Sequence, residues 1–183
     1  MILFVNACVR LESRTKKIAE KLLSKFDDEI HEVSLLNAEF PRTNEGFLRY
    51  RDLCISSGNF TDPYFNFAKD FAAADTIVIA APYWDLSFPA ALKQYIEHIN
   101  ILGITFEYTS EGMPRGLCNA KKLYYVMTAG GNYVPEDFGF GYIKSLAHNF
   151  YGIKEVKLIK ATGLDIAGAD SETIINNVIK NMP

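Results

Sequence analysis

The stretch Thr76–Gly103 constrains the fold of this chain more than any other part of the sequence. Its apolar run, Ile77–Ala81, is typical of a strand that is buried on both faces in a parallel sheet. The run ends at Pro82, and an aromatic turn then leads into a helical pattern that extends through Ile101. Strand, turn and helix follow one another, so the turn lies at the carboxyl end of the strand, where open α/β sheets bind ligands.

Aromatic and polar side chains are concentrated in this turn. Ser87 is predicted to be the N-cap of the helix, with Pro89 in its first turn. Pro82, Tyr83 and Trp84 would form a flat, rigid wall that suits an aromatic ring system. The alternative is that Tyr83 and Trp84 only cover the top of the core.

The composition excludes several classes of protein. A chain of 183 residues with 49% hydrophobic residues is sufficient for one large core and predicts a single domain, residues 1–183. A net charge of −3 and the lack of a Lys/Arg cluster argue against a nucleic-acid-binding surface. Met1–Ala7 is too short for a signal or membrane segment. Cys8, Cys54 and Cys118 have neither metal-ligand spacing nor an even disulfide framework, which favours a reducing, cytoplasmic location.

The remaining apolar runs complete an alternating pattern of strands and helices. Further strands are expected at Ile2–Val5, Ile30–Leu36, Lys122–Met127 and Lys154–Ala161, the last as a sheet edge because of its lysines. Short crossovers imply right-handed parallel connections, and five strands suit the doubly wound order 2-1-3-4-5. Residues 103–116 are consistent with either a small hairpin or an extended loop. The mixed segment Asn37–Asn66, with a helical piece around Glu45–Cys54, is a candidate lid or subunit contact.

This strand order brings three loops together in one crevice. In the first loop, Ser13 and Thr15 could cap a helix and donate to a phosphate at its N-terminus. The second loop is the aromatic turn, and in the third the pair Gly130-Gly131 could let the backbone approach a ligand closely. A plain N-cap and a plain tight turn are the alternatives for the first and third loops.

A phosphorylated, flat cofactor fits this combination of phosphate donors, aromatic wall and close backbone, and FMN is the best candidate. The sequence has no glycine-rich dinucleotide fingerprint and no P-loop lysine motif, which argues against a Rossmann or NTP site.

The residues of these loops resemble the FMN-dependent NADH:quinone oxidoreductases, also called azoreductases. The resemblance extends over nearly the whole chain and is sharpest in four stretches: Ala80–Lys93, Gly103–Thr109, Gly116–Lys122 and Thr128–Gly131. It implies a flavodoxin-like fold and a homodimer with the flavin at the subunit interface. It also implies reduction of quinones and azo compounds by NAD(P)H.

The resemblance further implies a set of site residues. Ser13 and Thr15 fall on the phosphate loop, and Phe150 matches an aromatic residue that lines the substrate pocket in some members. The sequence departs from the family pattern at Cys8, where serine is usual, at Asp85, where asparagine is common, and in a shorter segment before Thr76. The expected cofactor-binding residues are Cys8, Ser13, Thr15, Pro82, Tyr83, Trp84, Asp85, Leu86, Thr128, Ala129, Gly130, Gly131 and Tyr133.

Because the cofactor would carry the difficult chemistry, no dedicated catalytic acid or base and no metal are expected. His31, His98 and His148 are scattered and are interpreted as structural or surface residues. The expected partners are NAD(P)H and a small aromatic electron acceptor, used in a ping-pong mechanism. One alternative is a flavodoxin-type electron carrier, although a charge of −3 with 19 basic residues gives little support for the acidic docking face that such carriers use. Another is a flavin-free domain that makes protein contacts.

Overall fold

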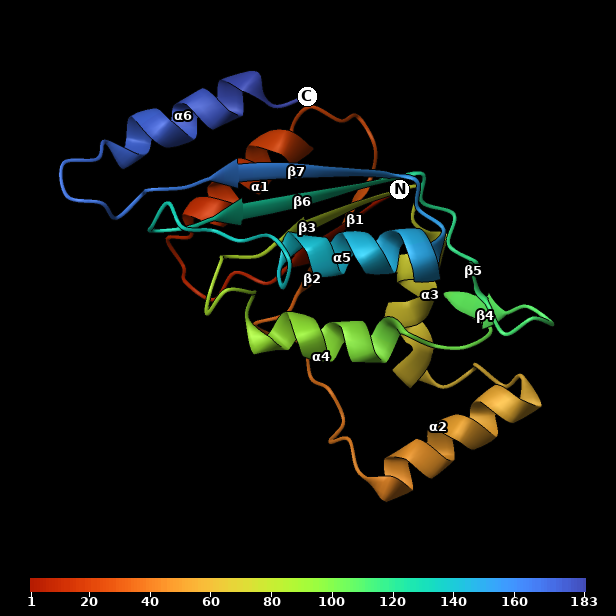
Figure 1. The fold of residues 1–183 in the computed structure, drawn as a ribbon. Coiled ribbons are helices and arrows are strands. Elements are labelled where there is room, and N and C mark those ends of the chain that lie inside the picture. Colours follow the sequence, from red (N-terminus) through yellow and green to blue (C-terminus); the bar gives the residue numbers. More distant parts are fainter.

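The computed structural model describes residues 1–183 as alternating strands and helices (Figure 1). Short helical turns, Pro63–Phe65 of the 3₁₀ type and Ala147–Tyr151 of the π type, precede α3 and follow α5. The elements are β1 (Ile2–Asn6), α1 (Arg14–Leu23), β2 (Ile30–Ser34), α2 (Glu45–Ser57), α3 (Asn66–Ala73), β3 (Thr76–Ala80), α4 (Ala90–Ile99), β4 (Phe106–Tyr108), β5 (Pro114–Gly116), β6 (Lys122–Thr128), α5 (Phe140–Leu146), β7 (Glu155–Ala161) and α6 (Ser171–Asn181).

The main sheet has five strands in the order β2-β1-β3-β6-β7, and every neighbouring pair is parallel. Since β6 and β7 are the fourth and fifth strands of this sheet along the chain, the predicted order 2-1-3-4-5 is confirmed. The lysine-bearing strand β7 forms one edge, as predicted. β4 and β5 pair separately as an antiparallel hairpin, which decides between the two structures considered for residues 103–116.

Helices cover both faces of the sheet because alternate residues of its central strands point to opposite sides. Leu3 and Val5 of β1 pack in the core formed with α3, α4 and α5, whereas Ile2 and Phe4 pack against α1 and α6. This burial explains the continuous apolar runs in the sequence. No helix of the structure combines the length and the apolar character that a membrane crossing requires.

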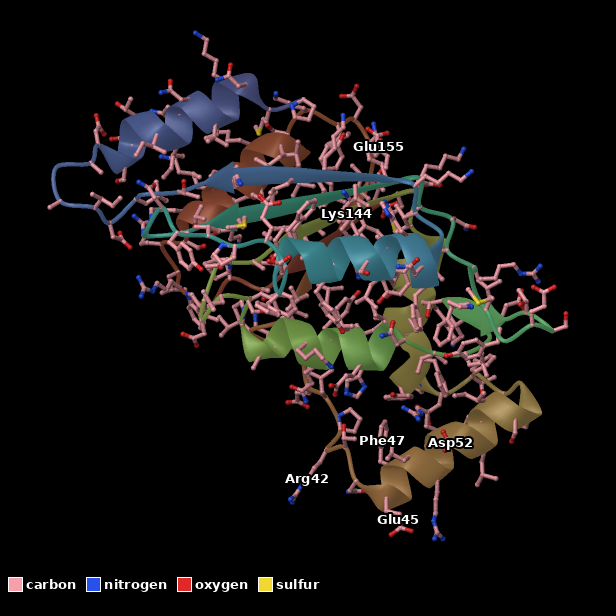
Figure 2. All side chains as sticks on the ribbon, in the orientation of Figure 1. Arg42, Glu45, Phe47, Asp52, Lys144 and Glu155 are labelled. Carbon is pink, nitrogen blue, oxygen red and sulfur yellow. The ribbon has the colours of Figure 1, made fainter.

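Helix α2 extends away from the sheet, as Figure 1 shows, and Cys54 is its only buried residue. Figure 2 shows the side chain of Phe47 directed from α2 toward the rest of the protein, while Glu45 points away from it. The Phe47 ring lies 4.9 Å from the Tyr64 ring and 6.0 Å from the ring of His98, a buried residue of α4. Aromatic contacts at one end of α2 therefore connect this helix to the body of the fold.

The β4–β5 hairpin packs closely on the π-helical turn that follows α5. A Cβ atom placed on Gly116 would lie 2.1 Å from the carbonyl carbon of Tyr151 and 2.2 Å from the amide nitrogen of Gly152. Next to this contact, the rings of Phe106 and Phe150 lie 4.8 Å apart. Only a residue without a side chain can therefore occupy position 116 in this arrangement.

The start of α4 differs from the prediction. The helix begins at Ala90 with Pro89 as its N-cap, so Ser87 does not cap it. Instead, Trp84 and Ser87 form a pair of backbone hydrogen bonds, 3.2 and 2.7 Å long, that closes a tight turn. Because this turn fixes the backbone of Ser87, its hydroxyl is directed elsewhere and donates to the Phe138 carbonyl oxygen.

Candidate functional site

A cavity of about 160 Å³ lies at the carboxyl ends of β1, β3 and β6, where the sequence predicted a ligand crevice. The three loops expected to converge there all contribute to it, together with the loop after β7. The lining residues are Val9, Arg10, Glu12, Ser13, Arg14, Thr15, Pro82, Tyr83, Trp84, Thr128, Gly130 and Asp165.

The first turn of α1 forms one side of this cavity. Ser13 is the N-cap, and its Oγ accepts a hydrogen bond from the Lys16 backbone N–H at 3.2 Å. The Ser13 hydroxyl hydrogen remains available to a ligand, as do N–H groups of the first turn that have no intrahelical acceptor. The positive end of the helix dipole suits an anion, and the cations Arg10 and Arg14 line the cavity beside two carboxylates, Glu12 and Asp165.

A buried hydroxyl pair connects the first loop to the loop after β6. Thr15 Oγ1 and Thr128 Oγ1 are 2.6 Å apart, and the two residues are 1% and 8% exposed. The Thr15 hydroxyl is thus already engaged inside the protein, whereas the sequence suggested it as a phosphate donor. One hydroxyl of the pair donates to the other, so a single O–H remains for a further acceptor.

The turn after β3 has an unusual backbone for its sequence. Asp85 and Leu86 both have positive φ angles, 51° and 66°. Two consecutive residues of this kind form the hairpin turn that Asn-Gly or Gly-Gly normally occupies. Each non-glycine residue held in this way costs about 1–3 kcal/mol, and such strain is concentrated at ligand sites.

The two glycines of the third loop have different surroundings. A Cβ atom on Gly130 would lie 2.4 Å from Asp165 Oδ2, whereas one on Gly131 has no other atom within 4 Å. Gly130, which lines the cavity, therefore makes room for a side chain of this protein, whereas Gly131 is exposed, lies outside the cavity lining and has open space around it. Three backbone hydrogen bonds join Ala129–Gly131 to the loop after β7, and a fourth joins Ala129 to Ala161 at the end of β7.

Five of the lining residues were not among the predicted site residues: Val9, Arg10, Glu12, Arg14 and Asp165. Two of these five, Arg14 and Asp165, interact directly. Arg14 Nη2 lies 2.9 Å from Asp165 Oδ1, and Arg14 Nη1 donates to the Leu164 carbonyl oxygen. The cationic character of the first loop was visible in the sequence and includes Arg14. The residues around Asp165 in the sequence do not identify it as a site residue. Asp165 comes close to the cavity only because β6 pairs with β7.

The other predicted site residues have more varied positions. Cys8 is buried, with its Sγ 3.7 Å from the Ala80 carbonyl oxygen, and burial raises the pKa of this thiol, so it carries no negative charge at neutral pH. Tyr133 is 82% exposed and lies in the loop after β6. Phe150 lies in the turn after α5 and contacts Phe106 of the hairpin, so a single chain does not bring it together with the cavity.

Comparisons with known proteins agree with this geometry. The model of a family described as having a flavodoxin-like fold matches residues 1–182. An FMN-dependent NADH:quinone oxidoreductase from Clostridium perfringens is 34% identical over 188 residues, which cover 98% of this chain and 94% of that protein. A protein of the same name from Caldicellulosiruptor saccharolyticus is 42% identical, covering 92% and 88%. The crystal structure of an azoreductase from Bacillus anthracis superimposes with a TM-score of 0.83 at 25% identity, covering 98% of this chain and 94% of that one. With a full-length family match and these relatives, the chain belongs to the flavodoxin-like family that includes the FMN-dependent NADH:quinone oxidoreductases.

Proposed function

We propose that this chain is an FMN-dependent oxidoreductase that transfers two electrons from NAD(P)H to quinones or azo compounds. The observation that carries the proposal is the convergence of an anion-binding helix start, an aromatic turn and the glycine loop on one cavity. FMN, when bound, supplies the hydride and electron chemistry. Relatives named FMN-dependent NADH:quinone oxidoreductase support the same function.

The residues of the cavity fit this cofactor. The Ser13 hydroxyl and the first turn of α1 would hold the phosphate, with Arg10 and Arg14 as nearby cations. Tyr83 and Trp84 line the cavity and offer flat surfaces for the ring system. Gly130 lines the cavity from the glycine loop, and the exposed Gly131 next to it along the chain has open space where a Cβ would lie.

The cavity lining contains no histidine and no cysteine. We propose that the chain would bind and orient the cofactor, and that its two substrates would use one place at the cofactor in turn. This arrangement corresponds to a ping-pong mechanism, for which initial rates at several acceptor concentrations should give parallel double-reciprocal lines. Intersecting lines would contradict it.

We also propose that the active form is a homodimer in the cytoplasm. Helix α2 supports this assembly, because Cys54 is its only buried residue and the side chains of Leu53 (68%) and Tyr50 (43%) are exposed. Apolar side chains that are exposed together on one helix are typical of a surface that another chain covers. Analytical ultracentrifugation should give a dimer, and a monomer with full turnover would contradict this assembly.

The visible spectrum of the purified protein, with identification of the released cofactor, tests the proposed function first. Ser13→Asp would place a carboxylate beside the phosphate and should weaken FMN binding about 100-fold, or roughly 3 kcal/mol. Asn44→Asp, at the N-cap of α2 and outside the cavity lining, also places a carboxylate at a helix N-cap and should leave FMN binding unaffected. Equal FMN retention in Ser13→Asp would mean that the phosphate binds elsewhere. A yellow protein with little NADH-dependent quinone reduction would instead indicate an electron carrier.

A further inference from the structure

The loop after β7 forms one side of the cavity and is fixed to the glycine loop by backbone hydrogen bonds (Figure 1). The Gly163 N–H donates to the Gly131 carbonyl oxygen at 2.9 Å. The Asp165 N–H donates to the Gly130 carbonyl oxygen at 3.0 Å. These bonds hold the backbone of Asp165 in place, and its side chain lines the cavity.

The carboxylate of Asp165 has one oxygen in an ion pair and one oxygen directed at the glycine loop. Oδ1 lies 2.9 Å from Arg14 Nη2. Oδ2 lies over Gly130, where a Cβ would come within 2.4 Å of it, and no donor of the protein bonds to this oxygen. Because the Asp165 side chain is 65% exposed, a ligand in the cavity can reach Oδ2.

The free carboxylate oxygen limits the kind of ligand group that can lie beside it. An ionised carboxylate accepts hydrogen bonds and donates none, so its partner must carry an O–H or N–H group. A phosphate monoester is largely dianionic at neutral pH and is not such a partner. The ion pair with Arg14 offsets the charge that Asp165 would otherwise place near the phosphate.

The position of Asp165 indicates which part of FMN would supply this donor. Ser13 marks the phosphate end of the cavity, and Tyr83 with Trp84 marks the ring end. The ribityl chain of FMN, which joins phosphate and ring, carries hydroxyl groups. Since β6 lies between β3 and β7, and neighbouring strands are about 4.8 Å apart, the loop after β7 begins roughly 10 Å from the aromatic turn. This separation favours the hydroxyl groups of the chain over the N–H group of the ring.

We infer that Asp165 is a cofactor-binding residue that accepts hydrogen bonds from the hydroxyl groups of the ribityl chain. The inference rests on the proposed function and deepens it, because it names a residue that selects a polyol chain between the phosphate and the ring. Glycine at position 130 is then required so that the carboxylate can lie at the cavity wall.

The test is a binding cycle with two flavins and does not depend on turnover. The full-length apoprotein is titrated with FMN and with a flavin phosphate in which a pentamethylene chain replaces the ribityl chain, and quenching of flavin fluorescence gives each Kd. The parent should bind FMN at least about tenfold more tightly than the analogue. Asp165→Ala should lower this preference about tenfold, or ~1.4 kcal/mol, as expected for one lost hydrogen bond to a charged group. Effects of a freed Arg14 on the phosphate cancel in the ratio, because both flavins carry that phosphate.

Two further variants complete the test. Asp165→Asn keeps the shape of the side chain and a neutral acceptor, so it should lower the preference about threefold, and it carries the test if Asp165→Ala does not fold. Glu12→Ala removes the other carboxylate of the cavity lining and should keep the parent preference within about twofold. Equal losses of preference in Glu12→Ala and Asp165→Ala would overturn the inference, because the overall charge of the cavity would then set the preference.

The remaining outcomes separate this inference from the proposed function. If the parent and both Asp165 variants prefer FMN by the same factor, or if the parent has no preference, Asp165 does not bind the ribityl hydroxyl groups and the inference alone fails. The first of these results would also follow if Asp165 bonded to the ring N–H, which both flavins share. If the parent apoprotein binds neither flavin, the proposed function fails and the role of Asp165 fails with it.

Discussion

The contact between the β4–β5 hairpin and the turn after α5 predicts a large effect of Gly116→Ala on stability. Before any relaxation, the new methyl carbon would lie 2.1 Å from the Tyr151 carbonyl carbon, whereas carbon atoms in contact are about 3.5–4.0 Å apart. Backbone lies on both sides of the contact, so no change of side-chain rotamer can relieve it. Overpacking costs about 1–3 kcal/mol when relaxation is possible, and we expect the upper end, about 3 kcal/mol. This is a large fraction of the ~5–15 kcal/mol that stabilises a typical domain.

Urea unfolding of the apoprotein, followed by circular dichroism, measures this effect. With an m-value of about 2 kcal/mol/M, the midpoint of Gly116→Ala should fall by about 1.5 M. Gly112→Ala is the matched control in the same hairpin, because position 112 has φ +76° but no atom within 4 Å of a Cβ. Its free energy of unfolding should fall by only about 1–2 kcal/mol, the cost of holding an alanine in the left-handed backbone region. The midpoint should therefore shift by less than about 1 M. A Gly116→Ala midpoint within about 0.3 M of the parent would refute the reasoning, since the hairpin would then move away at little cost.

Three further predictions concern the site and its surroundings. Gly131→Val should leave the apoprotein stability nearly unchanged but abolish FMN binding, because its side chain would occupy the only open space in the glycine loop; a yellow, active variant would contradict this. Asp85→Asn keeps a residue type that tolerates positive φ and removes a carboxylate near the proposed flavin. At about 7 Å and an effective dielectric near 20 the lost repulsion is about 2 kcal/mol, so redox titration should show a potential raised by roughly 50 mV; equal potentials would make Asp85 only a turn residue. Burial lowers the pKa of His98 below its usual 6.5, so His98 binds a proton more readily in the unfolded chain than in the folded protein. The free energy of unfolding therefore falls as the pH drops from about 6.5 toward the folded-state pKa. His98→Phe should reduce this loss in urea titrations at pH 7 and pH 5, whereas a change at the exposed His148 should not; parallel losses in His98→Phe and the parent would exclude His98 as the cause.

Much of the fold could be predicted from two apolar runs. Ile2–Val5 and Ile77–Ala81 have no polar alternation, and burial on both faces of a sheet is the simplest way to accommodate such runs. With helices between the strands, the rules for parallel connections leave few sheet orders, and the observed order was among them. The start of α4 could not be predicted in the same way. Leu86 at a positive φ contradicts local propensity, so the turn that displaces Ser87 from its expected capping role has no signature in the sequence.

The site was predictable where it depends on local sequence and not where it depends on packing. Ser13 at a helix start and Tyr83 after a buried strand can be recognised from their neighbours along the chain. The need for glycine at position 130 has a cause 35 residues away, the Asp165 carboxylate, and no neighbouring residue reveals it. Phe150 was assigned through a resemblance that involves two subunits, so its position in one chain did not follow from that assignment.

The strand order has a consequence for the chain while it is being synthesised. β1 lies between β2 and β3 in the sheet, and Ile2 pairs with Thr76. At about 5–20 residues per second, the roughly 70 intervening residues take about 4–14 s to make, and until then one edge of β1 has no partner. The cavity needs even more of the chain, because its lining extends from Val9 to Asp165. A ribosome-bound or prematurely terminated product that lacks the last strand and loop therefore has no complete site, so cofactor retention would distinguish finished molecules from fragments.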